Sequence, residues 1–153
     1  MIADYEAGTA PNFELYGLAL NHKHIPEIMK HTGLTQKPIF VPSVGAFPQG
    51  MIVCVPLQLS TLSSGPKLDA MHELFASYYA KAMTVIYHCN ANEKAYKAHR
   101  LSIDPAQDTD QMEIWMFGNP DDQQAVLVAR LDNLGKGAAG AAVQYLKLML
   151  SLT

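Results

Sequence analysis

Two histidines separated by one residue, His22 and His24, precede the segment Ile25-Pro26-Glu27. Proline suits the first turn of a helix and an acid suits its positive end, so a helix is predicted to begin here. A strand leading into that helix would place both imidazoles on one side, beside a helix N-terminus whose partial positive charge disfavours an imidazolium. A neutral histidine in that place can exchange protons near pH 7. The pattern therefore favours acid/base chemistry.

Two other uses of these histidines remain open from the residues alone. Both can be structural or surface side chains, or they can bind a metal ion. For a metal site the nearest third ligand is Glu27, and the HExxH spacing of many zinc enzymes does not occur.

A second candidate is the segment 132–140, which reads DNLGKGAAG. Its small residues let backbone or a ligand approach closely, and the start of the following helix offers free N–H groups suited to a carboxamide or a phosphate. The segment matches neither the GxGxxG fingerprint nor the phosphate loop GxxxxGK followed by Ser or Thr. Tight packing of the helix would also explain the small residues.

No residue stands out as a nucleophile. Cys54 and Cys89 lie in apolar, strand-like surroundings away from any helix start, and both are predicted to be buried thiols. Cys89 follows His88, but adjacent strand residues point to opposite faces. No GxSxG elbow occurs. The residues alone indicate an active site with an acid/base histidine but without its nucleophile.

The elements that must position these residues are short. Strands are predicted over residues 13–20, 51–59, 83–89, 111–117 and 125–131, and Pro56 marks the second as an edge strand or a bulge. Helices are predicted from Ile25 to Gly33, from the Ser-Ser-Gly-Pro turn at 63–66, and over 136–152. Residues 42–50 are predicted to form a shaped loop and 90–110 a polar connection. The apolar stripe of the middle helix, predicted to face the core, is Leu68, Met71, Phe75, Tyr78 and Tyr79.

Segregated strands with only two internal helices favour an α+β fold: a mixed or largely antiparallel sheet with helices on one face. The other face is then open, so a homo-oligomer through the sheet face is expected. The last helix is apolar or small nearly all round except at Gln144, Lys147 and Ser151. Such a helix is predicted to pack on something outside this chain.

The composition is that of one domain, because 153 residues with 49% hydrophobic side chains can bury a proper core. Its 11 basic and 14 acidic residues are scattered, which argues against nucleic acid as a partner. No apolar stretch reaches the ~20 residues of a membrane span, and the N-terminus carries no targeting signal. A cytoplasmic protein with small-molecule or protein partners is expected.

Four segments carry a resemblance to a known family: YGLALNHKHIPEIMKHTGL, PIFVPSVGAFPQGMIVCVPLQL, DPAQDTDQMEIWMFG and VARLDNLGKGAAGAAVQYLKLML. In this order they resemble the shorter class of N-acetyl-gamma-glutamyl-phosphate reductases, relatives of the aspartate-semialdehyde dehydrogenases. The resemblance implies a two-domain subunit, with a Rossmann domain that binds NADP and an α+β catalytic domain whose sheet forms the subunit interface. Residues 1–131 would belong to the catalytic and dimerisation domain, and 132–153 would return to the nucleotide-binding domain.

The resemblance also implies a reaction, in which a cysteine thiolate attacks N-acetyl-glutamyl 5-phosphate and NADPH reduces the thioester to the semialdehyde, a step of arginine biosynthesis. His22 first, and His24 second, match the acid/base motif, one of them moving protons and the other positioning substrate. Asn133, Gly135 and Gly137 match the stretch near the nicotinamide. No metal is implied.

The family's Gly-Cys-Tyr-Pro-Thr nucleophile segment and its glycine-rich phosphate loop do not occur in this sequence. The chain alone is therefore expected to be inactive, as part of a longer enzyme. The alternative is a non-catalytic, stand-alone oligomerisation or regulatory module derived from the same domain.

Overall fold

The computed structural model describes residues 2–89, 93–103, 110–119 and 121–151. The chain divides into two compact units, Met1–Pro48 and Gln49–Thr153, and the internal structure of each is considered separately. Among the described residues, no helix is both long and apolar enough to cross a membrane.

The first unit contains two helices and a two-stranded sheet, namely α1 (Ile2–Glu6), β1 (Phe13–Leu15), α2 (His24–Thr32) and β2 (Ser43–Gly45). β1 pairs antiparallel with β2. α2 ends as predicted at Gly33, whose φ of 72° is a left-handed conformation that glycine adopts at little cost. The first strand is shorter than predicted: it ends at Leu15, and the chain then turns through Gly17, which has a φ of 63°. β2 is a short strand within the predicted loop 42–50.

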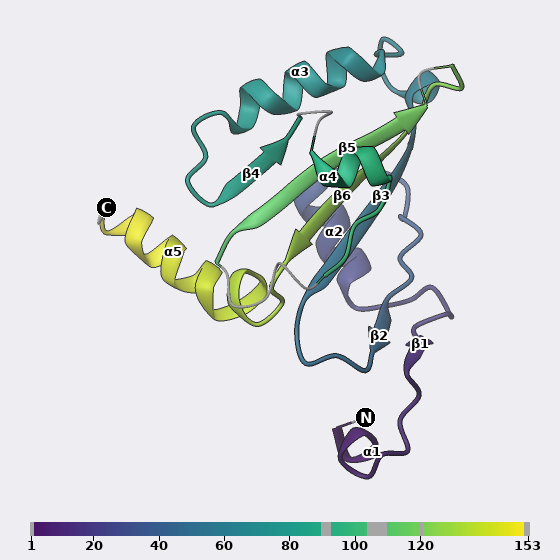
Figure 1. Cartoon of the computed structure of the whole chain (residues 1–153), viewed down its shortest axis with the longest axis vertical. Helices are drawn as coiled ribbons and strands as arrows, with labels where there is room; N and C mark the ends of the chain where they lie inside the picture. The colour runs from purple at the N-terminus through teal and green to yellow at the C-terminus, as the bar shows by residue number, and fades with distance from the viewer. Residues whose placement is uncertain (1, 90–92, 104–109, 120, 152–153) are drawn as a thin grey trace. The chain divides into compact units, whose positions relative to one another are not determined.

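The second unit is built on a four-stranded sheet of order β3-β6-β5-β4 (Figure 1). The strands are β3 (Met51–Gln58), β4 (Val85–His88), β5 (Met112–Asn119) and β6 (Gln124–Leu131). β6 runs antiparallel to both neighbours, and β4 runs parallel to β5. The predicted α+β class with a mixed sheet is confirmed. β3 is an edge strand, as Pro56 indicated, because proline cannot donate to a central ladder.

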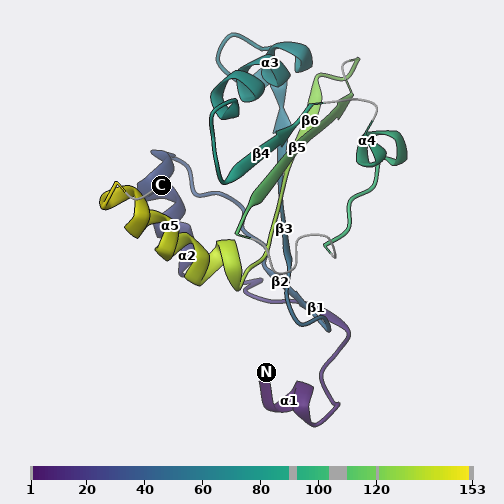
Figure 2. The same cartoon turned by 60° about the vertical axis from the view of Figure 1, so that its left-hand side comes forward.

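The helical elements of this unit are η1 (Leu59–Thr61), α3 (Leu68–Tyr79), α4 (Lys94–Ala98), the π-helical turn Gly135–Ala139 and α5 (Gly140–Met149). α4 lies in the connection 90–110, where no element is predicted. Figure 2 shows α3 and α4 on different sides of the sheet.

The core lies between α3 and one face of the sheet. Its buried centre is Leu59, Met116 and Ala125, against which Leu68, Met71 and Phe75 pack. The prediction that Tyr78 belongs to this core is wrong, since its side chain is 77% exposed. Tyr78 lies on the flank of α3 that it shares with the exposed Leu74.

Cys54 and Cys89 are free thiols, but both are exposed, so the prediction that they are buried is wrong. Cys54 pairs with Val128, which pairs with Trp115 next to the core residue Met116. Because adjacent strand residues point to opposite faces, Cys54 lies on the sheet face turned away from α3. Cys89 directly follows the end of β4.

Candidate functional site

His22 and His24 lie together at the start of α2, with ring centroids 4.6 Å apart. The rings of Tyr16 and Phe40 also flank His22, at centroid distances of 5.8 and 5.1 Å. His22 is half-buried and His24 is exposed. The proximity predicted for the two histidines is therefore present, although a turn produces it and not a strand.

Gly17 allows this turn to approach the imidazole. A Cβ at this position would lie 3.5 Å from Cδ2 of His22 and 3.4 Å from Pro42, on a backbone whose positive φ strains other residues. The turn therefore places one side of the His22 ring against backbone, and aromatic rings line other sides.

A backbone hydrogen bond selects the tautomer of His22. The N–H of His24 donates to Nδ1 of His22 at 3.2 Å. With that lone pair engaged, the neutral imidazole carries its proton on Nε2. His22 therefore presents an Nε2–H donor to a ligand oxygen.

Asn133 and the glycines after it directly follow β6 in the second unit. The carboxylate of Asp132 accepts the N–H of Leu134 at 2.8 Å, and its carbonyl accepts the N–H of Gly137 at 2.8 Å. Oδ1 of Asn133 accepts the N–H of Gly50 at 2.7 Å. The NH₂ of Asn133 is then the part of its amide suited to donate to a ligand.

The glycines at 135 and 137 form part of a π-helical turn that precedes α5. Such turns are rare and are frequently found at functional sites. An amide NH₂ beside a wide, small-residue turn is chemically suited to the carboxamide of a nicotinamide. The NH₂ of Asn133, beside a turn whose Gly135 and Gly137 carry no side chains, thus fits the cofactor role that the family resemblance implies, while the N–H of Gly137 is already donated to Asp132.

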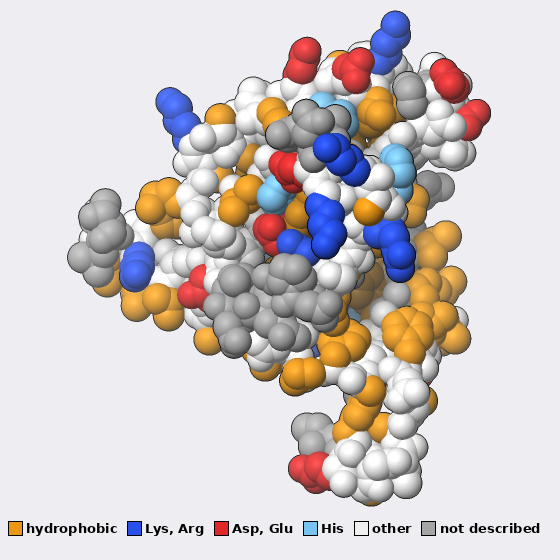
Figure 3. Space-filling view, in the orientation of Figure 1, with side chains coloured by type: hydrophobic (Ala, Val, Ile, Leu, Met, Phe, Trp, Pro, Cys, Tyr) orange, Lys and Arg blue, Asp and Glu red, His pale blue; other side chains and the backbone are white. Residues whose placement is uncertain are grey.

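A polar and aromatic group that the sequence reading missed lies on the sheet face turned away from α3. We call it the Trp115 cluster; its members are His88, Glu93, Glu113, Trp115 and Arg130. The His88 ring stacks on Trp115 at 4.3 Å with an interplanar angle of 1°, and the guanidinium of Arg130 lies 4.7 Å from the centre of the Trp115 ring. Figure 3 shows basic, acidic and histidine side chains gathered over this face.

An ion pair and several side-chain hydrogen bonds hold the Trp115 cluster together. Arg130 donates through Nε and Nη2 to Oε2 of Glu113 at 2.8 and 2.6 Å, and through Nη1 to the carbonyl of Ser102 at 3.0 Å. The two ring nitrogens of His88 face Glu93 and Glu113 at 2.8 and 3.1 Å. The cluster borders a hollow of about 690 Å³. The signal in the sequence was a single charge within each of two apolar strands, Glu113 in β5 and Arg130 in β6.

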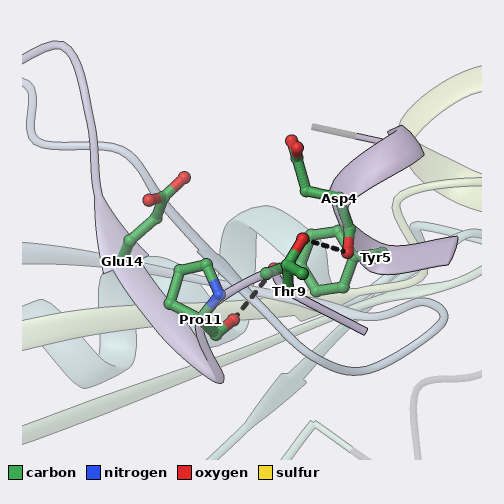
Figure 4. A pocket seen from close by; sticks show the side chains of 6 residues that line it. Asp4, Tyr5, Thr9, Pro11 and Glu14 are labelled. Atoms are coloured by element: carbon green, nitrogen blue, oxygen red, sulfur yellow. Dashed lines mark hydrogen bonds between the residues drawn. The ribbon is translucent and has the colours of Figure 1, made fainter. Parts of the chain in front are cut away.

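A smaller hollow of about 230 Å³ lies in the first unit, between α1 and β1. Figure 4 shows Asp4, Tyr5, Thr9 and Glu14 around it, with the Thr9 hydroxyl donating to the carbonyl of Asp4 at 3.2 Å. Neither hollow contains a residue predicted for catalysis or cofactor binding. Among the described residues, no three His, Cys, Asp or Glu side chains are grouped to hold a metal ion.

A comparison with protein families and a comparison with individual proteins point to the same enzyme family. The family described as semialdehyde dehydrogenase, dimerisation domain, matches residues 3–133. An N-acetyl-gamma-glutamyl-phosphate reductase of Brucella ovis is 49% identical over 147 residues, which cover 96% of this chain and 46% of that protein. A protein of the same name from Rhizobium etli is 47% identical over 146 residues, covering 95% of this chain and 46% of its own length. The chain thus spans about half the length of the curated relatives it matches, and the family resemblance read from the sequence is confirmed.

Proposed function

Because the chain belongs to the semialdehyde dehydrogenase dimerisation-domain family, we propose that it is the catalytic and dimerisation part of an NADPH-dependent N-acetyl-gamma-glutamyl-phosphate reductase. The complete enzyme would convert N-acetyl-glutamyl 5-phosphate to the 5-semialdehyde and phosphate in arginine biosynthesis. The observation that carries the proposal is the His22–His24 pair at the start of α2, with the His22 ring fixed by backbone and aromatic contacts. The nucleophilic cysteine and the Rossmann domain would come from the remainder of the longer polypeptide.

In this proposal His22 is the acid/base residue. Its Nε2–H would donate to the carbonyl oxygen of the substrate, where negative charge would develop during reduction. Proton transfer by a positioned histidine accelerates such steps by roughly 10² to 10⁴-fold. His24, exposed beside it, would position the substrate.

The second half-site would hold the cofactor. The NH₂ of Asn133 and the backbone around Gly135 and Gly137 would bind the nicotinamide end of NADPH, which supplies the hydride when bound. In the domain division we propose, residues 1–131 form the catalytic and dimerisation domain and 132–153 pack on the nucleotide-binding domain. The exposed apolar side chains of α5 support this, since Leu148 and Met149 are 73% and 82% exposed.

We further propose that the complete enzyme is a homo-oligomer through the sheet face turned away from α3. The family's description names a dimerisation domain, and this face carries the exposed Cys54 on an edge strand. Sedimentation velocity at micromolar concentration should show a dimer or larger species. A clean monomer would contradict the proposal.

A second candidate function is a non-catalytic oligomerisation or regulatory module. Such a module would keep the sheet of the dimerisation-domain family and lack catalysis. The two candidates differ in one expectation: the complete polypeptide turns over the acetylated substrate if it is the reductase, and does not if it is the module.

The experiment that separates them is an assay of the complete polypeptide in the reverse direction. N-acetyl-glutamate 5-semialdehyde, phosphate and NADP are supplied, and NADPH formation is followed by absorbance, with aspartate semialdehyde as the substrate control. The reductase proposal expects phosphate-dependent turnover with the acetylated substrate and none from the 153-residue chain alone. Turnover with the control substrate alone would refute the substrate, and no turnover with either would favour the module.

A further inference from the structure

Lys136 lies inside the π-helical turn but outside the set of residues assigned to the cofactor. We infer that Lys136 is a positioning residue, which holds the turn Gly135–Ala139 in the shape that presents its backbone and Asn133 to the nicotinamide. It would act through the turn, because the oxygens that its ammonium group contacts belong to Thr84 and Gln144. This inference rests on the proposed function and adds a residue to that site.

The ammonium group of Lys136 links the turn to the sheet. Its Nζ donates to Oγ1 of Thr84 at 3.1 Å. Thr84 directly precedes β4, and its carbonyl accepts the N–H of Met112, the first residue of β5, at 3.0 Å. The lysine therefore ties the turn to the point where two parallel strands begin.

The same ammonium group also links the turn to α5. Nζ of Lys136 donates to Oε1 of Gln144, and Nε2 of Gln144 donates to the carbonyl of Asp110 at 2.6 Å. A Cβ at the buried Gly140 would lie 2.9 Å from the carbonyl carbon of Gly135 and would overlap the carboxylate of Asp110, so a larger residue here would force the turn and Asp110 to shift. The first turns of α5 are therefore clamped between Thr84 and Asp110, with Lys136 and Gln144 as the bridge.

The choice of lysine follows from these contacts. The partners of its ammonium group are neutral oxygens, and the ion pairs found among the described residues do not include Lys136. Surface lysines ordinarily extend into water, so holding this half-buried side chain across the turn costs rotamer freedom. A wide π turn also needs outside contacts to persist against the ordinary α-helical form. Without Lys136, the turn that carries Gly135 and Gly137 would lose its links to Thr84 and Gln144 and would keep only its local hydrogen bonds to Asp132 and Gly140.

The test uses the complete polypeptide and four variants. Lys136→Met removes the charge and both hydrogen bonds at nearly constant volume, Lys136→Arg keeps a cationic donor, and Thr84→Val removes one partner. Lys81→Met is the matched control, because Lys81 is exposed beyond the end of α3 in the same unit. NADPH affinity is measured by fluorescence titration, kcat and KM for the semialdehyde by steady-state kinetics, and Tm without cofactor by calorimetry.

We expect Lys136→Met to raise the Kd for NADPH about tenfold, a scale set by the loss of charged hydrogen bonds. Thr84→Val should give an intermediate rise, Lys136→Arg a partial recovery, and Lys81→Met no change. KM for the semialdehyde should stay near the wild-type value, and Tm without cofactor should fall modestly, because the same hydrogen bonds also link α5 to the sheet. The inference is overturned if Lys136→Met binds NADPH like Lys81→Met, or if it lowers Tm and weakens substrate and cofactor equally. If the wild-type polypeptide itself does not bind NADPH, the proposed function fails, which is a distinct result.

Discussion

Replacing Glu113 by glutamine should destabilise the protein strongly, although the substitution changes one atom. Glu113 accepts two hydrogen bonds from Arg130, at 2.8 and 2.6 Å, and faces His88 at 3.1 Å. The side chain of Arg130 is only 9% exposed. Glu113→Gln removes the negative charge and leaves the guanidinium enclosed between Trp115 and the carbonyl of Ser102.

The magnitude follows from the burial of the pair. Breaking a buried ion pair by neutralising one partner costs about 3 to 5 kcal/mol. The side chain of Glu113 is 21% exposed, so solvent partly screens the pair and the lower end, about 3 kcal/mol, applies. For a protein of this size each kcal/mol shifts Tm by about 2 to 4 °C, so a decrease of about 6 to 12 °C is expected.

The assay is thermal unfolding by calorimetry of Glu113→Gln, Arg130→Met and the double variant. Glu73→Gln is the control, because Glu73 is an exposed acid on α3, where surface changes stay within about 0.5 kcal/mol. The double variant should be more stable than Glu113→Gln alone, since it leaves no unpaired charge on Arg130. A decrease in Tm below about 2 °C for Glu113→Gln would refute this reasoning, as would a double variant less stable than both single ones.

Three further predictions concern single side chains. In the complete enzyme, His22→Ala should lower kcat by about 10² to 10⁴-fold and leave the Kd for NADPH nearly unchanged; if stopped-flow kinetics show normal turnover, the acid/base role moves to His24. Met116 is fully buried, so Met116→Ala should lower the free energy of unfolding in urea by about 2 to 5 kcal/mol, and a loss below about 1 kcal/mol would contradict its place in the core. Burial lowers the pKa of His72, with Asp69 opposing that shift, and the hydroxyl of Tyr87 bonds its Nδ1 at 2.7 Å. Because the unfolded state then binds the proton more tightly, the contribution of His72 to the free energy of unfolding is complete above about pH 6.5 and is lost as the pH falls through its lower folded-state pKa. His72→Gln should therefore weaken the fall in the free energy of unfolding that urea titrations measure between pH 7 and 5. An unchanged pH dependence of that free energy would contradict the prediction.

The parts of the fold that were predictable depend on local chemistry. Gly33 ends α2 because glycine adopts a left-handed φ at little cost, and Pro56 marks an edge strand because proline has no N–H to donate to a central ladder. The short first strand was mispredicted, since the turn at Gly17 interrupts an otherwise apolar run. α4 has five residues, too few for a periodic pattern to indicate it.

The parts that were not predictable depend on which strands pair and which face is covered. The Trp115 cluster joins side chains from β4, β5 and β6, and these meet only through the register of two ladders. The exposure of Cys54 follows from the face that α3 covers, a tertiary fact that apolar strand composition does not contain. His22 and His24 were found because they are neighbours in sequence, and the backbone bond that selects the His22 tautomer was not foreseeable.

The claim that this chain is the catalytic half of a reductase is tested most directly by reading the coding DNA immediately upstream of the Met1 codon, in frame. The proposed function expects an open frame that encodes a glycine-rich phosphate loop followed by a cysteine segment resembling Gly-Cys-Tyr-Pro-Thr. An in-frame stop codon with neither segment upstream would contradict it and leave the stand-alone module as the better explanation.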